Sequence, residues 1–190
     1  MSGKVCPVWI GYFLSSPMRK LFQNPYTILG PYVRNGIKVL DIGCAMGFFS
    51  LPLARMVGMD GQVICVDVQE RMIQSLEKRA RKAGLTHRIQ TRTCPNTSLG
   101  LHDLAGEIDF ALAFAMAHEA PDISSLFSEM HEALREKGRA LIAEPKGHVT
   151  EKDFETTVSI AEQCGFIGVK RPDITRSRAI LLEKPRPQHT

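Results

Sequence analysis

The feature that most constrains the fold is an alternation of short apolar runs with amphipathic stretches, which begins near residue 37. Continuous β-branched runs of this length are typical of strands that are buried on both faces of a parallel sheet. Stretches with apolar residues three and four positions apart are typical of helices that cover such a sheet. The alternation therefore predicts an α/β fold in three layers, with a doubly wound sheet between helices.

The periodicity also gives approximate bounds for each element. Strands are expected at 37–42, 63–68, 89–93, 108–114, 139–143, 166–170 and 178–182, and helices at 47–57, 69–83, 122–137 and 150–164. The last two strands leave no room for a crossover helix, so they must form an antiparallel pair. We expect a seven-stranded, mainly parallel sheet with one antiparallel strand, in a single domain of residues 1–190 whose core spans 37–184.

Composition agrees with a folded domain. The chain has 190 residues, of which 44% are hydrophobic and 23% charged, so it can bury a core and is not a disordered sequence. Its five cysteines include no CxxC pair, which argues against a metal site or a redox motif. Free thiols without a recognisable secretion signal favour the reducing cytoplasm, and no apolar run is long enough to span a membrane.

The net charge of +4 comes mainly from two basic clusters. They comprise Lys78, Arg79, Arg81, Lys82, Arg88 and Arg92, and then Lys170, Arg171, Arg176, Arg178, Lys184 and Arg186. Such clusters can bind phosphate backbones, but they are more often the solvated faces of helices. Charge alone therefore argues against a nucleic-acid partner rather than for one.

The loop after the first expected strand is the strongest functional signal. It reads DIGCAMG over residues 41–47, with Gly43 and Gly47 where the backbone must pass close to a ligand and open a helix. A nicotinamide-binding loop would read G-x-G-x-x-G, which this loop does not. Asp41, just before the glycines, suits a ligand with positive charge better than a pyrophosphate.

A second carboxylate, Asp67, ends the second expected strand, twenty residues after Gly47. A carboxylate at this place can accept hydrogen bonds from both hydroxyls of a ribose. Either feature alone is also explained by ordinary turns and caps. Both within one β–α–β unit indicate a nucleoside ligand, and we expect removal of Asp67 to change the stability of the fold little.

These segments resemble the Rossmann-like methyltransferases that depend on S-adenosylmethionine. VLDIGCAMGFFSLPLA at 39–54 is similar to their first motif and VICVDV at 63–68 to their second, while 108–118 and LREKGRALIAEP at 134–145 are similar to later motifs. The resemblance covers residues from about 25 to the end and is strongest for the branch of ubiquinone and menaquinone biosynthesis. It implies a seven-stranded sheet in the order 3-2-1-4-5-7-6.

The resemblance also implies roles for particular residues. Asp41, Gly43, Cys44 and Gly47 would surround the methionyl part of S-adenosylmethionine, Asp67 would hold its ribose and Val68 would contact its adenine. Phe114 would lie beside the sulfonium. The chain departs from the family at Ala45, where a glycine is usual, and at 93–96, where the usual aspartate for adenine is missing. Recognition of the adenine would then rely on the main chain, Cys94 or Asn96. The usual Pro-Gly-Gly turn is Glu136-Lys137-Gly138 here.

A general base is needed only if the methyl acceptor must lose a proton. The candidates near the strand ends are His118, Glu119, Glu144 and His148. His118 follows the fourth expected strand, where family members often place residues that face the substrate. A histidine that bridges loops for structural reasons is an equally good interpretation.

The first 32 residues lie before the sheet and hold the only tryptophan and all the tyrosines of the chain. These aromatic residues are Trp9, Tyr12, Phe13, Phe22, Tyr26 and Tyr32. They predict a lid over the cofactor cleft or, alternatively, a terminal segment that packs on the edge of the sheet.

The resulting prediction is a methyltransferase that uses S-adenosylmethionine, releases S-adenosylhomocysteine and acts on a small-molecule acceptor. The alternative is an RNA- or protein-directed methyltransferase that uses the basic clusters. A cofactor-binding regulatory protein without turnover is a third interpretation. The sequence leaves the acceptor, the methylated atom and the oligomeric state open.

Overall fold

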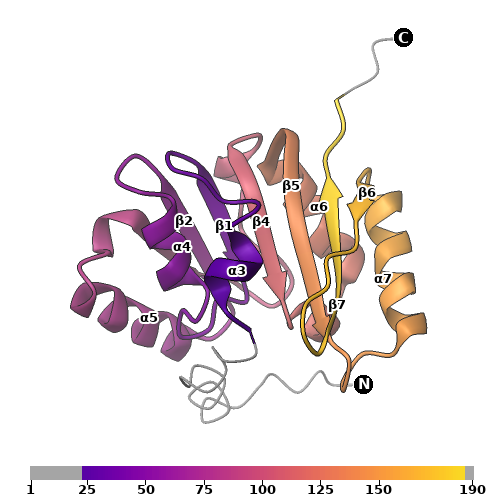
Figure 1. Cartoon of the computed structure of the whole chain (residues 1–190), viewed down its shortest axis with the longest axis horizontal. Coiled ribbons are helices and arrows are strands. Elements are labelled where there is room, and N and C mark those ends of the chain that lie inside the picture. Colours follow the sequence, from indigo (N-terminus) through magenta and orange to yellow (C-terminus); the bar gives the residue numbers. More distant parts are fainter. Residues whose placement is uncertain (1–22, 187–190) are drawn as a thin grey trace. The chain divides into compact units, whose positions relative to one another are not determined.

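A computed structural model describes residues 23–186 of the chain. Its strands form a seven-stranded sheet in the order β3-β2-β1-β4-β5-β7-β6 (Figure 1), which confirms the fold class and the strand order expected from the sequence. The chain divides after Pro95 into two compact units. Trp9, Tyr12, Phe13 and Phe22 lie outside the described residues. No helix within 23–186 has the length and apolar character needed to cross a membrane.

The first unit holds three parallel strands and their helices (Figure 1). Its elements are α3 (Pro25–Leu29), β1 (Lys38–Ile42), α4 (Ser50–Met56), β2 (Gln62–Asp67), α5 (Glu70–Lys82), the 3-10 turn η1 (Thr86–Arg88) and β3 (Ile89–Thr93). Strand β2 pairs in parallel with β1 on one side and β3 on the other. The short helix α3 was not expected from the sequence; Asn24 caps it by accepting a hydrogen bond from Tyr26 N at 3.0 Å.

Helix α5 is held on the sheet by one apolar face. Met72, Ile73, Leu76 and Ala80 are buried, and their spacing of three and four residues places them on the side that contacts β2 and β3. The charged residues of the helix occupy the remaining sides. The helix ends before Gly84, whose φ of +68° lies in the left-handed region that closes many helices.

The sequence predicts that this helix begins at Gly47, but helix α4 begins at Ser50. The prediction was wrong because the residues before Ser50 form turns that a helix cannot contain. Ala45 has a φ of +46° and Gly47 a φ of +83°, both in the left-handed region. The loop that follows β1 therefore extends as far as Phe49.

The second unit holds the other four strands (Figure 1). Its elements are the turn η2 (His102–Leu104), β4 (Ile108–Phe114), the turn η3 (Ala117–Glu119), α6 (Ile123–Ala133), β5 (Leu134–Pro145), α7 (Glu151–Gln163), β6 (Ile167–Lys170) and β7 (Ser177–Glu183). Strands β4 and β5 are parallel, whereas β7 runs antiparallel to both β5 and β6. Asp122 and Thr150 cap α6 and α7 as expected, through bonds to Ser124 N and Asp153 N.

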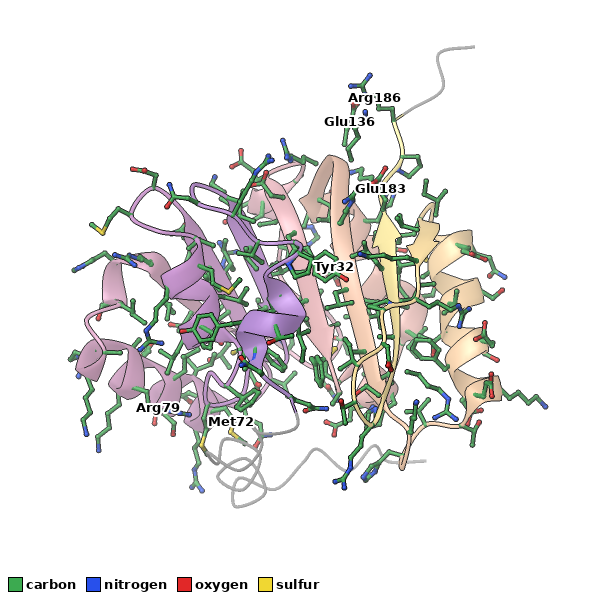
Figure 2. The ribbon with its side chains drawn as sticks, viewed as in Figure 1. Tyr32, Met72, Arg79, Glu136, Glu183 and Arg186 are labelled. Atoms are coloured by element: carbon green, nitrogen blue, oxygen red, sulfur yellow. The ribbon has the colours of Figure 1, made fainter. Side chains whose placement is uncertain are left out.

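Helix α6 ends at Ala133 rather than at Lys137. The prediction of a longer helix was wrong because Leu134 already pairs with Ile108 of β4, so β5 starts at residue 134 instead of 139. Lys137 has a φ of +60°, which no helical residue adopts, and its N–H donates to Lys184 O at 2.8 Å. Its neighbour Glu136 lies at the same end of the unit as Glu183 (Figure 2).

Lys137→Gly is expected to raise the free energy of unfolding by roughly 0.5–1 kcal/mol, because glycine adopts the left-handed region without steric strain. Lys137 is exposed, so the loss of its side chain should cost little. Denaturation in urea measures the difference. Lys137→Ala is the matched control: it removes the same side chain but keeps the strained Cβ, and an equal gain in this variant would contradict the argument.

Candidate functional site

Three buried carboxylates mark the carboxyl ends of strands. Within residues 23–186, Asp41, Asp67 and Glu144 are the only acidic residues in the buried class, at 3%, 8% and 1% exposed. They lie in the last two positions of β1, β2 and β5 respectively. Burial of an acid costs free energy unless its oxygens are paired, so each of these residues is a candidate functional residue within its own unit.

Asp67 holds the loop after β1 to the end of β2. Its Oδ2 accepts a hydrogen bond from Ala45 N at 2.9 Å, and its Oδ1 accepts one from Gln69 N at 2.8 Å. Burial raises the pKa of Asp67, while these hydrogen bonds act in the opposite direction. The carboxylate thus organises two backbone segments, a structural role that the sequence did not reveal. We therefore now expect its removal to destabilise the loop.

Gly47 is required for both its backbone and its lack of a side chain. Its φ is +83°, and a Cβ at this position would lie 2.4 Å from Cδ1 of Leu76 on α5. Any larger residue would push the loop away from the helix. Ala45, at a φ of +46°, occupies a conformation that favours glycine, which is the physical reason for the glycine that the family usually has there.

Asp41 connects β1 to the first residue of α4. Ser50 Oγ donates a hydrogen bond to Asp41 Oδ2 at 2.6 Å, and both side chains are buried. Burial raises the pKa of Asp41 from its ordinary 3.8 to about 7, and the nearby charge of Asp67 adds to this increase. Asp41 thus fixes the start of α4; its contact with a ligand stays a prediction.

Arg79 is a functional residue that the sequence analysis assigned only to a basic cluster. Its side chain, from the same helix as Met72 (Figure 2), donates from Nη1 to Met46 O at 2.6 Å. Partial burial lowers the pKa of its guanidinium group. Arg79 therefore fastens the middle of the loop to α5. The available signal was its position three residues after the buried Leu76, beside the apolar face of the helix.

The remaining candidates for cofactor binding lie around this loop in the first unit. Cys44 is buried, its Sγ is 3.8 Å from Ala45 O, and burial raises the pKa of its thiol. Gly43 N and Cys44 N both donate to Val66 O, at 2.9 and 3.1 Å. Val68, directly after β2, is 38% exposed.

Cys94 continues the same edge, since its N–H donates to Asp67 O at 3.1 Å. Its side chain is buried, as is that of Phe114 at the end of β4 in the second unit. The structure describes their positions, and their contacts with a cofactor stay predictions.

In the second unit, His118 pairs with Glu144. His118 Nδ1 forms a short hydrogen bond with Glu144 Oε2, and Ala117 N donates to Glu144 Oε1 at 2.8 Å. The hydrogen bond between His118 and Glu144 is the main reason that the pKa of His118 is raised. Glu119, the other residue predicted to be catalytic, is more distant: its Oε1 lies 4.0 Å from His118 Nε2. The geometry makes Glu144 the partner of His118.

Comparison with known proteins identifies the family. The methyltransferase domain family matches residues 34–177, and the chain belongs to it. A solved S-adenosylmethionine-dependent methyltransferase from Aquifex aeolicus superposes with a TM-score of 0.84 at 20% identity, covering 95% of this chain and 100% of that one. This similarity supports the fold.

Two curated relatives match smaller parts. The ubiquinone/menaquinone biosynthesis C-methyltransferase UbiE of Cellvibrio japonicus is 29% identical over 146 residues, which cover 75% of this chain and 57% of the relative. The 23S rRNA (uracil(1939)-C(5))-methyltransferase RlmD of Acinetobacter baumannii is 45% identical over 53 residues, which cover 28% of this chain and 12% of the relative. The chain thus spans little more than half of the first relative and a small part of the second.

Asp41→Asn is expected to stabilise the protein above neutral pH. Because the folded-state pKa exceeds the unfolded one, the folded protein binds more protons between about pH 4 and 7, and stability falls as pH rises through this window. Asparagine avoids the buried charge, so the variant should gain roughly 1–3 kcal/mol at pH 8.5 and less at pH 5. Denaturation at the two pH values tests this. A gain independent of pH would contradict it, and exposed Asp60→Asn is the control.

Arg79→Met is expected to loosen the loop, because Met46 O loses its partner. The free energy of unfolding should fall by about 0.5–1.5 kcal/mol, and amide exchange at Ala45 and Gly47 should become faster. Hydrogen exchange followed by NMR measures both. Arg81→Met removes an exposed arginine of the same helix and serves as the control. Equal exchange in the two variants would show that Arg79 does not hold the loop.

Proposed function

We propose that the protein is an S-adenosylmethionine-dependent methyltransferase that transfers a methyl group to a small-molecule acceptor. The observation that carries this proposal is the carboxylate of Asp67, which two backbone amides hold at the end of β2. A backbone hydrogen bond from Val68 also reaches this carboxylate, which has about four acceptor sites and so retains capacity for a ribose hydroxyl. Family membership supports the same cofactor.

The chemistry of the loop fits this cofactor better than a dinucleotide. Residues 41–47 contain no lysine or arginine for a pyrophosphate, and Asp41 adds negative charge near the loop. S-adenosylmethionine carries positive charge on its sulfonium and its amino group, and it has no phosphate. We propose that the glycine loop and Cys44 contact its methionyl part, Val68 and Cys94 its adenine and Phe114 its sulfonium.

When bound, the cofactor supplies a methyl group that is already activated. The protein then has to align the acceptor with this methyl group and exclude water. Asp67 and Arg79 contribute by holding the loop in one conformation, which lowers the cost of ordering it on binding. Gly47 keeps the loop in close contact with α5.

Internal contacts of the basic clusters favour a small acceptor over RNA. In the first cluster, Arg79 and Arg88 donate to the backbone oxygens of Met46 and Ala54. In the second cluster, Lys184 donates to His131 O and Leu134 O at 2.7 Å, and so caps the end of α6.

Arg171 and Arg178 of the second cluster are engaged as well, with Glu155 and with Val149 O. These basic residues have structural tasks, which reduces the charge available for a polyanion. The C-methyltransferase activity named for the UbiE relative agrees with a small acceptor.

We also propose that the chain forms one methyltransferase domain and works in the cytoplasm. The family match at 34–177 includes residues of both compact units, which supports one methyltransferase domain. Cys44, Cys65, Cys94 and Cys164 are free thiols, which favours the cytoplasm.

Calorimetric titration of the whole chain tests the proposed cofactor. S-adenosylmethionine and S-adenosylhomocysteine should bind and NAD should not. Binding of NAD alone would overturn the assignment. A parallel titration with an RNA oligonucleotide at two salt concentrations tests the alternative acceptor, since affinity for a polyanion falls steeply with salt.

Asp67→Ala is expected to weaken binding of S-adenosylmethionine by roughly 1.5–3 kcal/mol, the range for hydrogen bonds to a charged group. This change raises the dissociation constant about tenfold to a hundredfold. Calorimetry measures the constant, and thermal melting identifies a temperature at which the variant is folded. Asp60→Ala, an exposed acid of the same unit, should bind normally. An unchanged constant in Asp67→Ala would place the ribose elsewhere.

A further inference from the structure

Glu144 is a buried carboxylate near a strand end of the second unit. It lies near the end of β5, its side chain is 1% exposed, and each of its oxygens has a partner. One partner is the backbone N–H of Ala117 and the other is the ring of His118. Removing a carboxylate from water costs several kcal/mol before it is compensated, so its presence needs a further reason.

The hydrogen bond determines which nitrogen of His118 carries the proton. Because the Glu144 carboxylate can only accept, Nδ1 must donate to it. In the neutral ring Nε2 then has the free lone pair. The side chain of His118 is 29% exposed, and its Nε2 lies 4.0 Å from Glu119 Oε1. The pair thus presents a base with a fixed tautomer at the end of β4.

The surroundings of His118 increase its basicity. Glu144 of β5 and Glu119 of η3 both raise the pKa of its ring, and burial acts in the opposite direction. His148, in the segment after β5, has its ring centroid 6.3 Å from that of His118. Helix α6 also contacts η3. Among the described residues, the charges that raise the pKa of His118 are those of Glu144 and Glu119, and neither belongs to α6.

We propose that His118 is the general base for an acceptor with a weakly acidic hydroxyl, a phenol or an enol, and that Glu144 is its positioning residue. This inference rests on the proposed function and narrows its substrate class. The acceptor O–H bond breaks and an N–H bond forms at Nε2, which leaves the electron pair on oxygen. That pair forms the O–CH₃ bond, and the electrons of the S–CH₃ bond stay on sulfur.

Acceptors that already have free electrons for the reaction at neutral pH do not need His118 and Glu144. A thiolate or a tertiary amine reacts without losing a proton, whereas a phenol with a pKa near 10 remains mostly protonated at pH 8. A base at the site is worth roughly 10²-fold to 10⁴-fold in rate for such a hydroxyl. A general base at the site is therefore of use to methyl acceptors with a hydroxyl group, because these must lose a proton.

Nitrogen NMR of the protein without acceptor tests the positioning step. In the wild type at high pH, His118 should show a protonated Nδ1 and an unprotonated Nε2, the reverse of the usual tautomer. Glu144→Gln has a single amide oxygen for two donors, so the tautomer should mix and the titration midpoint of His118 should move to lower pH. The signal is assigned by its loss in His118→Asn, and exposed His102→Asn is the control.

Turnover of two matched probes tests the substrate class. With S-adenosylmethionine, 2-naphthol should be methylated at a rate that rises with pH through the His118 midpoint and then levels off. His118→Asn should lower this rate about 10²-fold to 10⁴-fold and lower methylation of 2-naphthalenethiol much less, since the thiol is already ionised. Glu144→Gln should lower kcat and shift the pH profile with little effect on KM.

The outcomes separate this inference from the proposed function. Absence of S-adenosylmethionine binding in the wild type would remove the proposed function and the inference with it. Normal cofactor binding with an ordinary His118 tautomer would overturn the role of Glu144 alone. Normal cofactor binding with methylation of the thiol only, or of the naphthol at a rate unaffected by His118→Asn, would overturn the hydroxyl class.

Discussion

The hydrogen bonds from Ala45 N and Gln69 N to the carboxylate of Asp67 are the interaction on which the rest of the candidate site depends. They join the loop after β1 to the end of β2, two segments that are brought together only by parallel strand pairing. A carboxylate is suited to this task because it accepts several hydrogen bonds and keeps lone pairs for a ligand. The same group thus shapes the loop and remains available for binding.

Buried acids recur at this protein's strand ends, and each has a different partner. Asp41 is paired with a hydroxyl, Asp67 with two amides and Glu144 with an amide and an imidazole. Burial, and not the hydroxyl of Ser50, raises the pKa of Asp41, whereas the hydrogen bond from His118 to Glu144 raises the pKa of the histidine. All three cost stability relative to apolar residues, a cost that is common at functional sites.

Backbone strain explains where the sequence-based prediction failed. Both wrong helix bounds fall near residues in the left-handed region: Ala45 and Gly47 before α4, and Lys137 after α6. Apolar periodicity carries no information on such residues, because alanine and lysine are otherwise good helix formers. Only the surrounding contacts hold them there: Asp67 for Ala45, and the backbone of Lys184 for Lys137.

The sequence by itself determined the seven-stranded order, the parallel strands with the antiparallel β7, the caps at Asp122 and Thr150, and the places of Asp41, Gly47 and Asp67 at the loop after β1 and the end of β2. These features depend on local periodicity, on turn chemistry and on resemblance between motifs. The tertiary structure decided that Glu144 and not Glu119 is the partner of His118, and that Arg79 holds Met46. Residues 118 and 144 are far apart in the chain, and only the pairing of β4 with β5 brings them into contact, because partners between strands are selected by register and not by sequence distance.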